Sequence, residues 1–387
     1  MALPISYNIR NLLVRWRVSL LAIGGVALVV GVFVVLTAMA SGFRIALRST
    51  GRTDNAIVVR KGSTSEIISE ISRENAAVIM LDPRVARDSD GRPLASPEIL
   101  TFLNLPRKLD RVLVNVAVRG VAPAAFKVRG GVRLVTGRLF RPGLLEVVVG
   151  RRTRDRFGLN IDMPLKIRKS NWNVVGIFES EGSSFESEVW ADLQTLAEPI
   201  RRTQDYQSIV LRLTDPGSLQ ELTSALESNP GWQVEVKQER RYYEDQSGSV
   251  TASLMGLTLF VSIIMGVGAV FAAMNTMYAI VSARTCEIGT LRAMGFSRSA
   301  VLISFITESI LLSGVGGLLG CLLALPINTI TSATNSVNFA ELAFAFHTTP
   351  LALSIGLIFA MIMGVFGGLL PALRAARLPI TSALREI

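Results

Sequence analysis

The residues best suited to a chemical task lie in a short polar stretch, 284–298, between two long apolar runs. Glu287 and Arg292 offer opposite charges, and the apolar residues of the stretch fall roughly at helical spacing: Ile288, Leu291, Met294 and Phe296. A helix with one charged and one apolar side is suited to contact with another protein. The chemistry available here is therefore recognition, and we expect a soluble partner to dock on this stretch.

Motifs for catalysis are absent from the sequence. It contains no Gly-x-x-x-x-Gly-Lys-[Ser/Thr] loop to hold a nucleotide phosphate, no His-Glu-x-x-His zinc site and no Gly-x-Ser-x-Gly elbow. The single histidine, His347, cannot form a metal cluster alone and is interpreted as an interfacial side chain. We therefore predict no catalytic residue, no metal site and no cofactor bound by this chain.

Four apolar runs must position the polar stretch. They cover 18–40, 250–283, 299–331 and 351–373, and each is long enough for a helix to cross about 30 Å of hydrocarbon. The charged residues are thus segregated into the insert 41–249 and the ends of the runs. The pattern predicts an α-helical membrane protein with one span, a large insert and three further spans.

The first apolar run has a second interpretation, because Ala38-Met39-Ala40 fits the small-residue rule for signal-peptide cleavage. However, the run exceeds the about 7–15 apolar residues of a signal peptide, so we interpret it as a retained anchor. The residues before it, 1–17, predict an amphipathic helix at the cytoplasmic membrane surface.

Arginines beside the spans set the orientation. They precede the first span, occupy the loop 284–298 and follow the fourth span in the tail 374–387, whereas the short loop 332–350 has no basic residue. Both termini and the loop 284–298 are therefore predicted to be cytoplasmic. The insert 41–249 and the loop 332–350 are predicted to lie outside.

The net charge of +10 does not indicate nucleic-acid binding, because much of the excess belongs to these flanking arginines. The densest basic cluster, in the insert, is interpreted as a solvated face, with anionic lipid headgroups or an acidic partner as the alternative. It comprises Arg151, Arg152, Arg154 and Arg156.

The insert 41–249 is predicted to be an α+β domain without cysteines, held by an ordinary core. Strand and helix patterns alternate at its two ends, with Ser65 as the predicted cap of a helix over 66–72. Its middle, about 112–192, is rich in strand signals broken by glycines. We therefore expect a βαβ-type subdomain with a β-rich insertion.

The apolar runs contain one acidic residue and two pairs of glycines that need separate interpretation. Glu308 lies inside the third run, where a carboxylate is costly; it is interpreted as a protonated or hydrogen-bonded packing residue, or alternatively as a polar hinge or part of a passage. Two Gly-x-x-x-Gly pairs permit close helix approach: Gly316 with Gly320, and Gly364 with Gly368. Contact within one subunit is favoured for them, and dimerisation is left open.

The polar stretch, together with Glu308-Ser309, Gly316-Gly317 and the segment 371–385, resembles the MacB/FtsX-type permeases of ATP-binding-cassette (ABC) systems. Segments 118–121, 137–140 and 174–178 resemble the periplasmic core domain of that family. The resemblance extends over nearly the whole chain, and its most specific part is 287–295.

This resemblance implies a permease subunit of the bacterial inner membrane that pairs with a second permease subunit, expected to be a second copy. It also implies a separate cytoplasmic ABC ATPase, which would bind ATP and Mg, because the chain contains no nucleotide-binding motif. The loop 284–298 would be a coupling helix. Its expected ATPase contacts are Glu287, Ile288, Gly289, Leu291, Arg292, Ala293, Met294 and Gly295.

The function implied by the resemblance is mechanotransmission, in which ATP hydrolysis moves the external domain and drives export or extraction of a periplasmic substrate. A periplasmic adaptor and an outer-membrane channel would be further partners, with membrane lipids around the spans. A lipoprotein-releasing permease, or an FtsX-like scaffold that activates a cell-envelope hydrolase, is the alternative. A receptor without an ATPase would leave the polar stretch unexplained.

Overall fold

The computed structural model describes residues 16–229, 231–329, 331–335 and 341–379. The predicted surface helix over 1–17 and the end of the tail 374–387 lie largely outside these residues. The chain divides into two compact units, which we call the helix bundle and the sheet domain. The helix bundle comprises Met1–Ser41, Ser253–Ile330 and Phe346–Ile387, and the sheet domain comprises Gly42–Ala252 and Thr331–Ala345.

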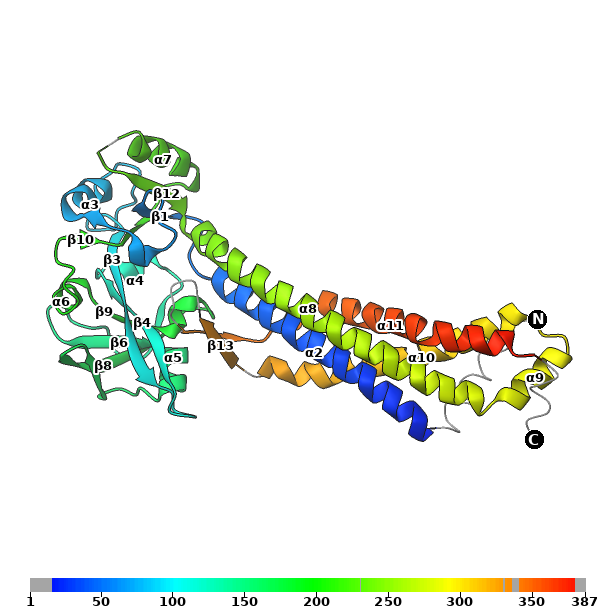
Figure 1. Cartoon of the computed structure of the whole chain (residues 1–387). Helices are drawn as coiled ribbons and strands as arrows, with labels where there is room; N and C mark the ends of the chain where they lie inside the picture. The colour runs from blue at the N-terminus through cyan, green and yellow to red at the C-terminus, as the bar shows by residue number, and fades with distance from the viewer. Residues whose placement is uncertain (1–15, 230, 330, 336–340, 380–387) are drawn as a thin grey trace. The chain divides into compact units, whose positions relative to one another are not determined.

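Four helices are long and apolar enough to cross a membrane, as the sequence predicts. They are α2 (Trp16–Arg48), α8 (Glu239–Ser282), α10 (Arg298–Ala324) and α11 (Pro350–Arg377). A short helix, α9 (Thr285–Ala293), connects α8 to α10 (Figure 1). The polar stretch therefore forms a helix of its own between the second and third membrane helices.

Two helix ends differ from the predicted runs. Helix α8 begins at Glu239 rather than near 250, because its first turns are polar and hydropathy does not register them as part of a span. Helix α10 ends at Ala324 rather than near 331, and a 3-10 turn, η4 (Leu325–Thr329), follows it. Pro326 explains this end, because proline has no N–H to continue the helical hydrogen bonds.

The sheet domain is built on a ten-stranded mixed sheet. Its strand order is β12-β1-β11-β3-β4-β9-β6-β8-β5, and β7 pairs with β8. The pairs β4 with β9 and β6 with β8 are parallel, and the other neighbours are antiparallel. The strands are β1 (Asn55–Arg60), β3 (Ala95–Pro106), β4 (Leu113–Val121), β5 (Arg133–Gly137), β6 (Glu146–Gly150), β7 (Pro164–Ile167), β8 (Ser170–Glu179), β9 (Glu188–Asp192), β11 (Ser208–Arg212) and β12 (Val234–Gln238).

Short helices and two small ladders complete the sheet domain. The ladders pair β2 (Ile71–Ser72) with β10 (Asp205–Tyr206), and β13 (Thr331–Asn335) with β14 (Glu341–Ala345). The α-helices are α3 (Arg73–Met80), α4 (Ala125–Val128), α5 (Arg151–Phe157), α6 (Leu193–Ala197) and α7 (Leu219–Glu227). The 3-10 turns are η1 (Glu66–Ile68), η2 (Ser184–Ser187) and η3 (Pro216–Ser218).

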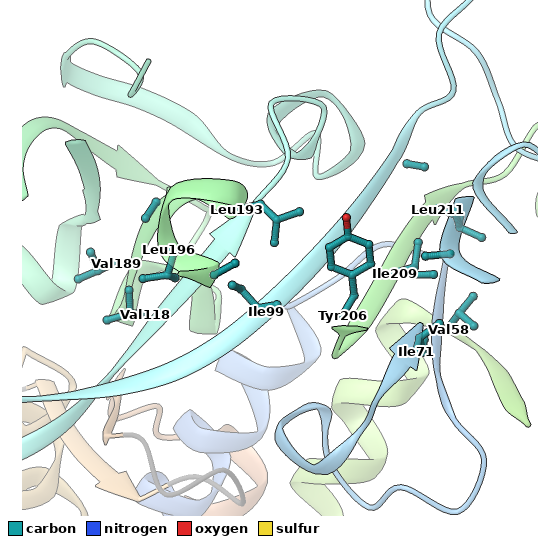
Figure 2. Close-up of a cluster of buried hydrophobic side chains, with 14 of the residues drawn as sticks. Val58, Ile71, Ile99, Val118, Val189, Leu193, Leu196, Tyr206, Ile209 and Leu211 are labelled. Atoms are coloured by element: carbon teal, nitrogen blue, oxygen red, sulfur yellow. The ribbon is translucent and has the colours of Figure 1, made fainter. Parts of the chain in front are cut away.

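The sheet has a core on each face, because alternate residues of a strand point to opposite sides. Val58 of β1 belongs to one core and Ile57 to the other. The first core, which Figure 2 shows around Ile99 and Tyr206, is covered by residues of α3, α6 and α7. The second is covered by α4, η2 and the first turns of α8. Burial on both faces explains the continuous apolar runs of β1 and β6.

Several local predictions need correction. The segment 66–72 is not a helix: it forms η1 and β2, and the helix begins later, as α3, capped by Ser72. Glu66 is fully buried, so tertiary contacts override its helical pattern. The loop 332–350 contains the β13–β14 hairpin. The strands of the predicted β-rich part, 112–192, are present and pair with those from the two ends of the insert in one continuous sheet.

Candidate functional site

Helix α9 is delimited by local sequence signals. Gly295 follows its last turn with a φ of +99°, a left-handed conformation that glycine adopts at little cost and that commonly ends helices. Ser297 then begins α10, because its side chain accepts a hydrogen bond from the Ala300 N–H at 3.2 Å. The predicted coupling segment 284–298 is thereby shaped into a separate short helix between two turns.

One face of α9 is fixed inside the helix bundle. Ile288 is buried and belongs to a cluster with apolar residues of α8, α10 and α11, among them Met277, Phe305 and Ala375. Gly289 is also buried, and Leu291 is half-buried. This face therefore holds α9 against three membrane helices.

Arg284, at the turn between α8 and α9, connects α9 to the interior of α10. Its Nη1 donates to Glu308 Oε2 at 3.0 Å, and its Nε donates to Glu287 Oε2 at 2.9 Å. The guanidinium lies 5.1 Å from the centre of the Phe305 ring. The intramembrane acid Glu308 is thus held in a buried ion pair.

Arg292 points toward the end of α11 rather than away from the bundle. Its Nη1 donates to the Leu378 carbonyl oxygen at 2.7 Å and to the Ala376 carbonyl oxygen at 3.3 Å. The carbonyls at a helix C-terminus lack helical partners, so a guanidinium is well suited to satisfy them. Arg292 therefore fastens α9 to α11.

The opposite face of α9 is exposed. It carries Glu287, Ala293, Met294 and Gly295 from the predicted set of eight residues, together with Thr290. Met294 has 65% of its surface exposed, although it is a large apolar residue. A face with an exposed methionine is suited to contact with another protein.

The four glycines predicted to pack helices all face helices of the same chain. A Cβ on Gly316 would lie 2.9 Å from the Ile23 carbonyl oxygen, and one on Gly320 would lie 2.5 Å from the Ala27 carbonyl oxygen, so both glycines face α2. Gly364 and Gly368 of α11 face Ser313 and Ser309 of α10 in the same way. Ser309 also donates to the Gly364 carbonyl oxygen at 2.7 Å.

The sheet domain contains a buried charge cluster that was not predicted from the sequence. Its centre is Arg119 on β4, whose guanidinium donates to Glu66 at 2.7 Å, to Glu98 at 2.9 Å and to both carboxylate oxygens of Glu188 at 2.8 Å. All four side chains are almost fully inaccessible to solvent. Such a cluster is costly to form and strongly destabilising to break.

A second arginine extends this buried charge cluster to α8. Arg129 donates to Glu98 at 2.7 Å and also to Glu239, the first residue of α8. Glu239 accepts further hydrogen bonds from the Arg52 N–H at 3.0 Å and from Asn55 at 2.8 Å. The start of α8 is therefore fixed to the segment that follows α2 and to the centre of the sheet.

The electrostatics of Glu98 follow from this arrangement. Burial alone would raise the pKa of its carboxyl group, but the charges of Arg129 and Arg119 outweigh burial and hold the pKa below its ordinary value. Glu98 is therefore an ionised group in the middle of the domain.

Within the described residues no group of three or more histidine, cysteine, aspartate or glutamate side chains is placed to bind a metal. His347 lies at the surface, and its backbone N–H donates to the Ala38 carbonyl oxygen at 3.2 Å. The arginines of α5 find carboxylates within the domain, as in Arg151 with Glu179 at 3.3 Å and Arg152 with Glu186 at 3.4 Å.

Four helices long and apolar enough to cross a membrane, a short helix between the second and third, and a large mixed-sheet domain inserted after the first are the features of a permease-type membrane subunit. Residues 19–229 match the MacB-like periplasmic core domain, and residues 259–380 match the FtsX-like permease C-terminal domain. The chain belongs to the MacB/FtsX-type family of ABC transporter permeases.

Curated relatives are the macrolide export ATP-binding/permease proteins MacB. The one from Bordetella avium is 29% identical over 75% of this chain and 46% of its own length, and the one from Hahella chejuensis is 25% identical over 85% and 55%. The chain thus spans about half the length of these relatives.

Among solved structures, the periplasmic region of MacB from Actinobacillus actinomycetemcomitans is 14% identical, with a TM-score of 0.38 over 54% of this chain and 95% of that one. The extracellular domain of the transporter YknZ from Gram-positive bacteria is 12% identical, with a TM-score of 0.36 over 47% and 99%.

Proposed function

We propose that this chain is the permease subunit of a mechanotransmitting ABC exporter in the bacterial inner membrane. A separate cytoplasmic ATPase would dock on α9, and its cycle of ATP binding and hydrolysis would move the sheet domain on the other side of the membrane. A second copy of the chain would complete the membrane part, and a periplasmic adaptor with an outer-membrane channel would receive the substrate. Both chain termini would be cytoplasmic.

The observation that carries this proposal is that one face of α9 is held by the helix bundle while the other face is exposed. Its inner face is held to α8, α10 and α11 by Ile288, by the Arg284–Glu308 pair and by Arg292. Its outer face exposes Met294 and the neighbouring Ala293. A push on the outer face would therefore be passed to three membrane helices rather than absorbed by a loose loop.

The buried charge cluster provides the second attachment that transmission needs, at the sheet domain. Helix α8 contributes residues to both units, and its first residue, Glu239, is bound by Arg129, Asn55 and the backbone of Arg52. An axial or tilting movement of α8 would act directly on the central strands of the sheet. Mechanical transmission needs such a fixed attachment, since a flexible joint would dissipate the movement.

The structure also determines which residue tests the coupling best. Charge reversal of Glu287 or Arg292 would disturb the contacts with Arg284 or with the end of α11, so loss of partner binding would be ambiguous. Met294 is exposed and makes no such contact, so Met294→Ala changes the outer face alone. Met255→Ala is the matched control, because Met255 is another exposed methionine, located in α8.

The experiment is co-expression of the full chain with a candidate ABC ATPase, followed by purification and measurement of bound ATPase and of ATP hydrolysis. We expect Met294→Ala, and more strongly Met294→Glu, to lower ATPase recovery and permease-stimulated hydrolysis, while Met255→Ala leaves both unchanged. Full recovery and full hydrolysis with Met294→Glu would reject the assignment of α9 as the docking helix.

A further inference from the structure

A cleft of about 540 Å³ lies in the sheet domain, outside the coupling elements described above. Its walls come from the distal part of β3, from the end of α5 and from β7. The Lys108 N–H donates to the Arg156 carbonyl oxygen at 3.0 Å and so ties the turn after β3 to α5. The volume is within the roughly 300–1,000 Å³ of small-molecule sites.

The floor of the cleft contains apolar side chains, although polar atoms make up the larger share of the accessible lining. Leu165 and Leu159 belong to the buried core on one face of the sheet, and Leu103, Leu105 and Phe157 are partly buried against that core. The partly buried side chains Leu103, Leu105 and Phe157 present the carbon surface that an apolar ligand would cover. Such burial favours a ligand with a hydrocarbon body.

The rim of the cleft is basic. Arg111, Lys166 and Arg168 line it, and the residues that line it include no acid. In the part of the chain that the structure describes, no carboxylate forms an ion pair with these three side chains, in contrast with Arg151 and Arg152 of α5. An anionic group would therefore meet positive charge that the protein itself does not neutralise.

Both rim arginines have an unusual backbone conformation. Six described residues other than glycine have a positive φ: Arg111, Asp162, Arg168, Glu181, Arg201 and Gln233. Three of them are arginines, and Arg111 and Arg168 line the cleft, while Arg168 and Arg201 line an adjoining hollow that also contains Glu198. Glycine adopts this conformation without strain, so an arginine at such a position costs backbone energy; at Arg168 the tight turn between β7 and β8 requires the conformation.

We propose that this cleft binds a single-chain amphipathic anion, with the hydrocarbon chain on the floor and the anionic group between Arg111 and Arg168. The charge of the rim and the apolar floor together specify this class of ligand. The proposal goes beyond the ATPase-coupled function, and it can be tested without any ATPase.

The test uses the full chain in nanodiscs of zwitterionic phosphatidylcholine and a dodecanoate probe that carries a photoreactive diazirine. After irradiation, mass spectrometry locates the labelled peptides. We expect saturable labelling within 102–111 and 157–168, and competition by unlabelled dodecanoate but not by the neutral dodecanol.

Variants of the rim separate binding from folding. The double variant Arg111→Gly with Arg168→Gly removes both guanidiniums and relieves both strained backbones, so its unfolding temperature should be unchanged or higher. Labelling should fall about tenfold or more, as expected for the loss of charged hydrogen bonds. Gln233→Gly relieves the same backbone strain away from the cleft and should label like the wild type. Lys166→Gln, which alters no strained residue, should also lower labelling.

Three results would overturn the proposal. One is undiminished labelling of the double variant, and another is equal competition by dodecanol. The third is cleft labelling that increases with anionic lipid in the nanodisc but is insensitive to soluble dodecanoate, which would assign the rim to contact with a bilayer surface.

Discussion

Arg284 and Glu308 form an ion pair in which both side chains are nearly inaccessible, with exposed fractions of 5% and 3% and an N–O distance of 3.0 Å. Arg284 lies at the turn before α9 and Glu308 lies within α10, so the pair joins α9 to α10. A buried charge of either kind is strongly unfavourable without a partner. The ion pair therefore contributes more to the stability of these two buried side chains than the helices in which they lie.

Replacement of one partner should be more damaging than replacement of both. We expect Arg284→Gln to destabilise the protein by about 3–5 kcal/mol, because it removes the guanidinium that pairs with the buried Glu308 carboxylate. Glu308→Gln should cost less, because Arg284 keeps its contact with Glu287. The double variant Arg284→Met with Glu308→Leu should recover part of that loss. A double-mutant cycle on the thermal unfolding midpoint in one detergent measures the coupling, and strictly additive effects would show that the pair does not interact.

The sequence predicts the four membrane helices because their signal is local: each apolar run is long enough to be recognised without knowledge of its neighbours. Strands β1 and β11 are predictable for a similar reason, since Val58 and Ile209 belong to short runs of β-branched residues bounded by turn residues. Element boundaries fail where the local signal is absent, as in the polar first turns of α8.

Contacts between charged residues that are far apart in the chain could not be predicted from the sequence. Strand β3 contains Pro97 and Glu98, which disfavour a strand locally, yet the buried arginines compensate Glu98 and allow the strand to form. The sequence indicates the Arg284–Glu308 pair only weakly. It shows that an acid alone in an apolar run needs a partner near the same end of the span. The positive φ of Arg111 and Arg168 has no sequence signal comparable to a glycine.

The stability of the sheet domain should depend on pH through Glu98. Because the folded-state pKa of this carboxyl group is lowered, its contribution is complete above its unfolded pKa of about 4.3 and is lost as the pH falls toward the folded value. Glu98→Gln should be less stable at pH 7 and should lose less stability than the wild type on acidification. Glu221→Gln, at an exposed carboxylate, is the control and should follow the wild type.

Tryptophan fluorescence provides the readout, because Trp172 and Trp190 are both buried in this domain. Unfolding midpoints would be measured for the three proteins between pH 7 and pH 3. An acid-induced loss of stability that is the same in Glu98→Gln and the wild type would show that Glu98 is not the ionised centre of the cluster.

Close packing of α10 against α2 should depend on Gly320 but not on Gly314. A Cβ on Gly320 would lie 2.5 Å from the Ala27 carbonyl oxygen, whereas a Cβ on Gly314 of the same helix would have no heavy atom within 4 Å. We therefore expect Gly320→Ala to lower the thermal unfolding midpoint and Gly314→Ala to leave it unchanged or raise it slightly. Equal effects of the two substitutions would contradict the tight contact.

The attachment of α8 to the sheet domain can be tested at Gly51, with Gly62 as a matched control. Both glycines have a positive φ, +78° and +81°, so alanine should cost about 1–2 kcal/mol in backbone strain at either position. Only at Gly51 would the new Cβ also meet neighbouring atoms, with the Glu239 Cγ at 2.8 Å and the Glu239 carbonyl carbon at 3.0 Å, whereas Gly62 has open space. Gly51→Ala should therefore be the more destabilising substitution.

The same pair of variants reports on the hydrogen bonds of Glu239, because displacement of its backbone would move the carboxylate away from Arg129 and Asn55. We expect limited proteolysis to cleave the segment 49–54 faster in Gly51→Ala than in Gly62→Ala at the same temperature. If the two variants match in both unfolding midpoint and cleavage rate, the start of α8 is not held against the segment that follows α2. Its movement could then not be transmitted to the sheet through the buried charge cluster.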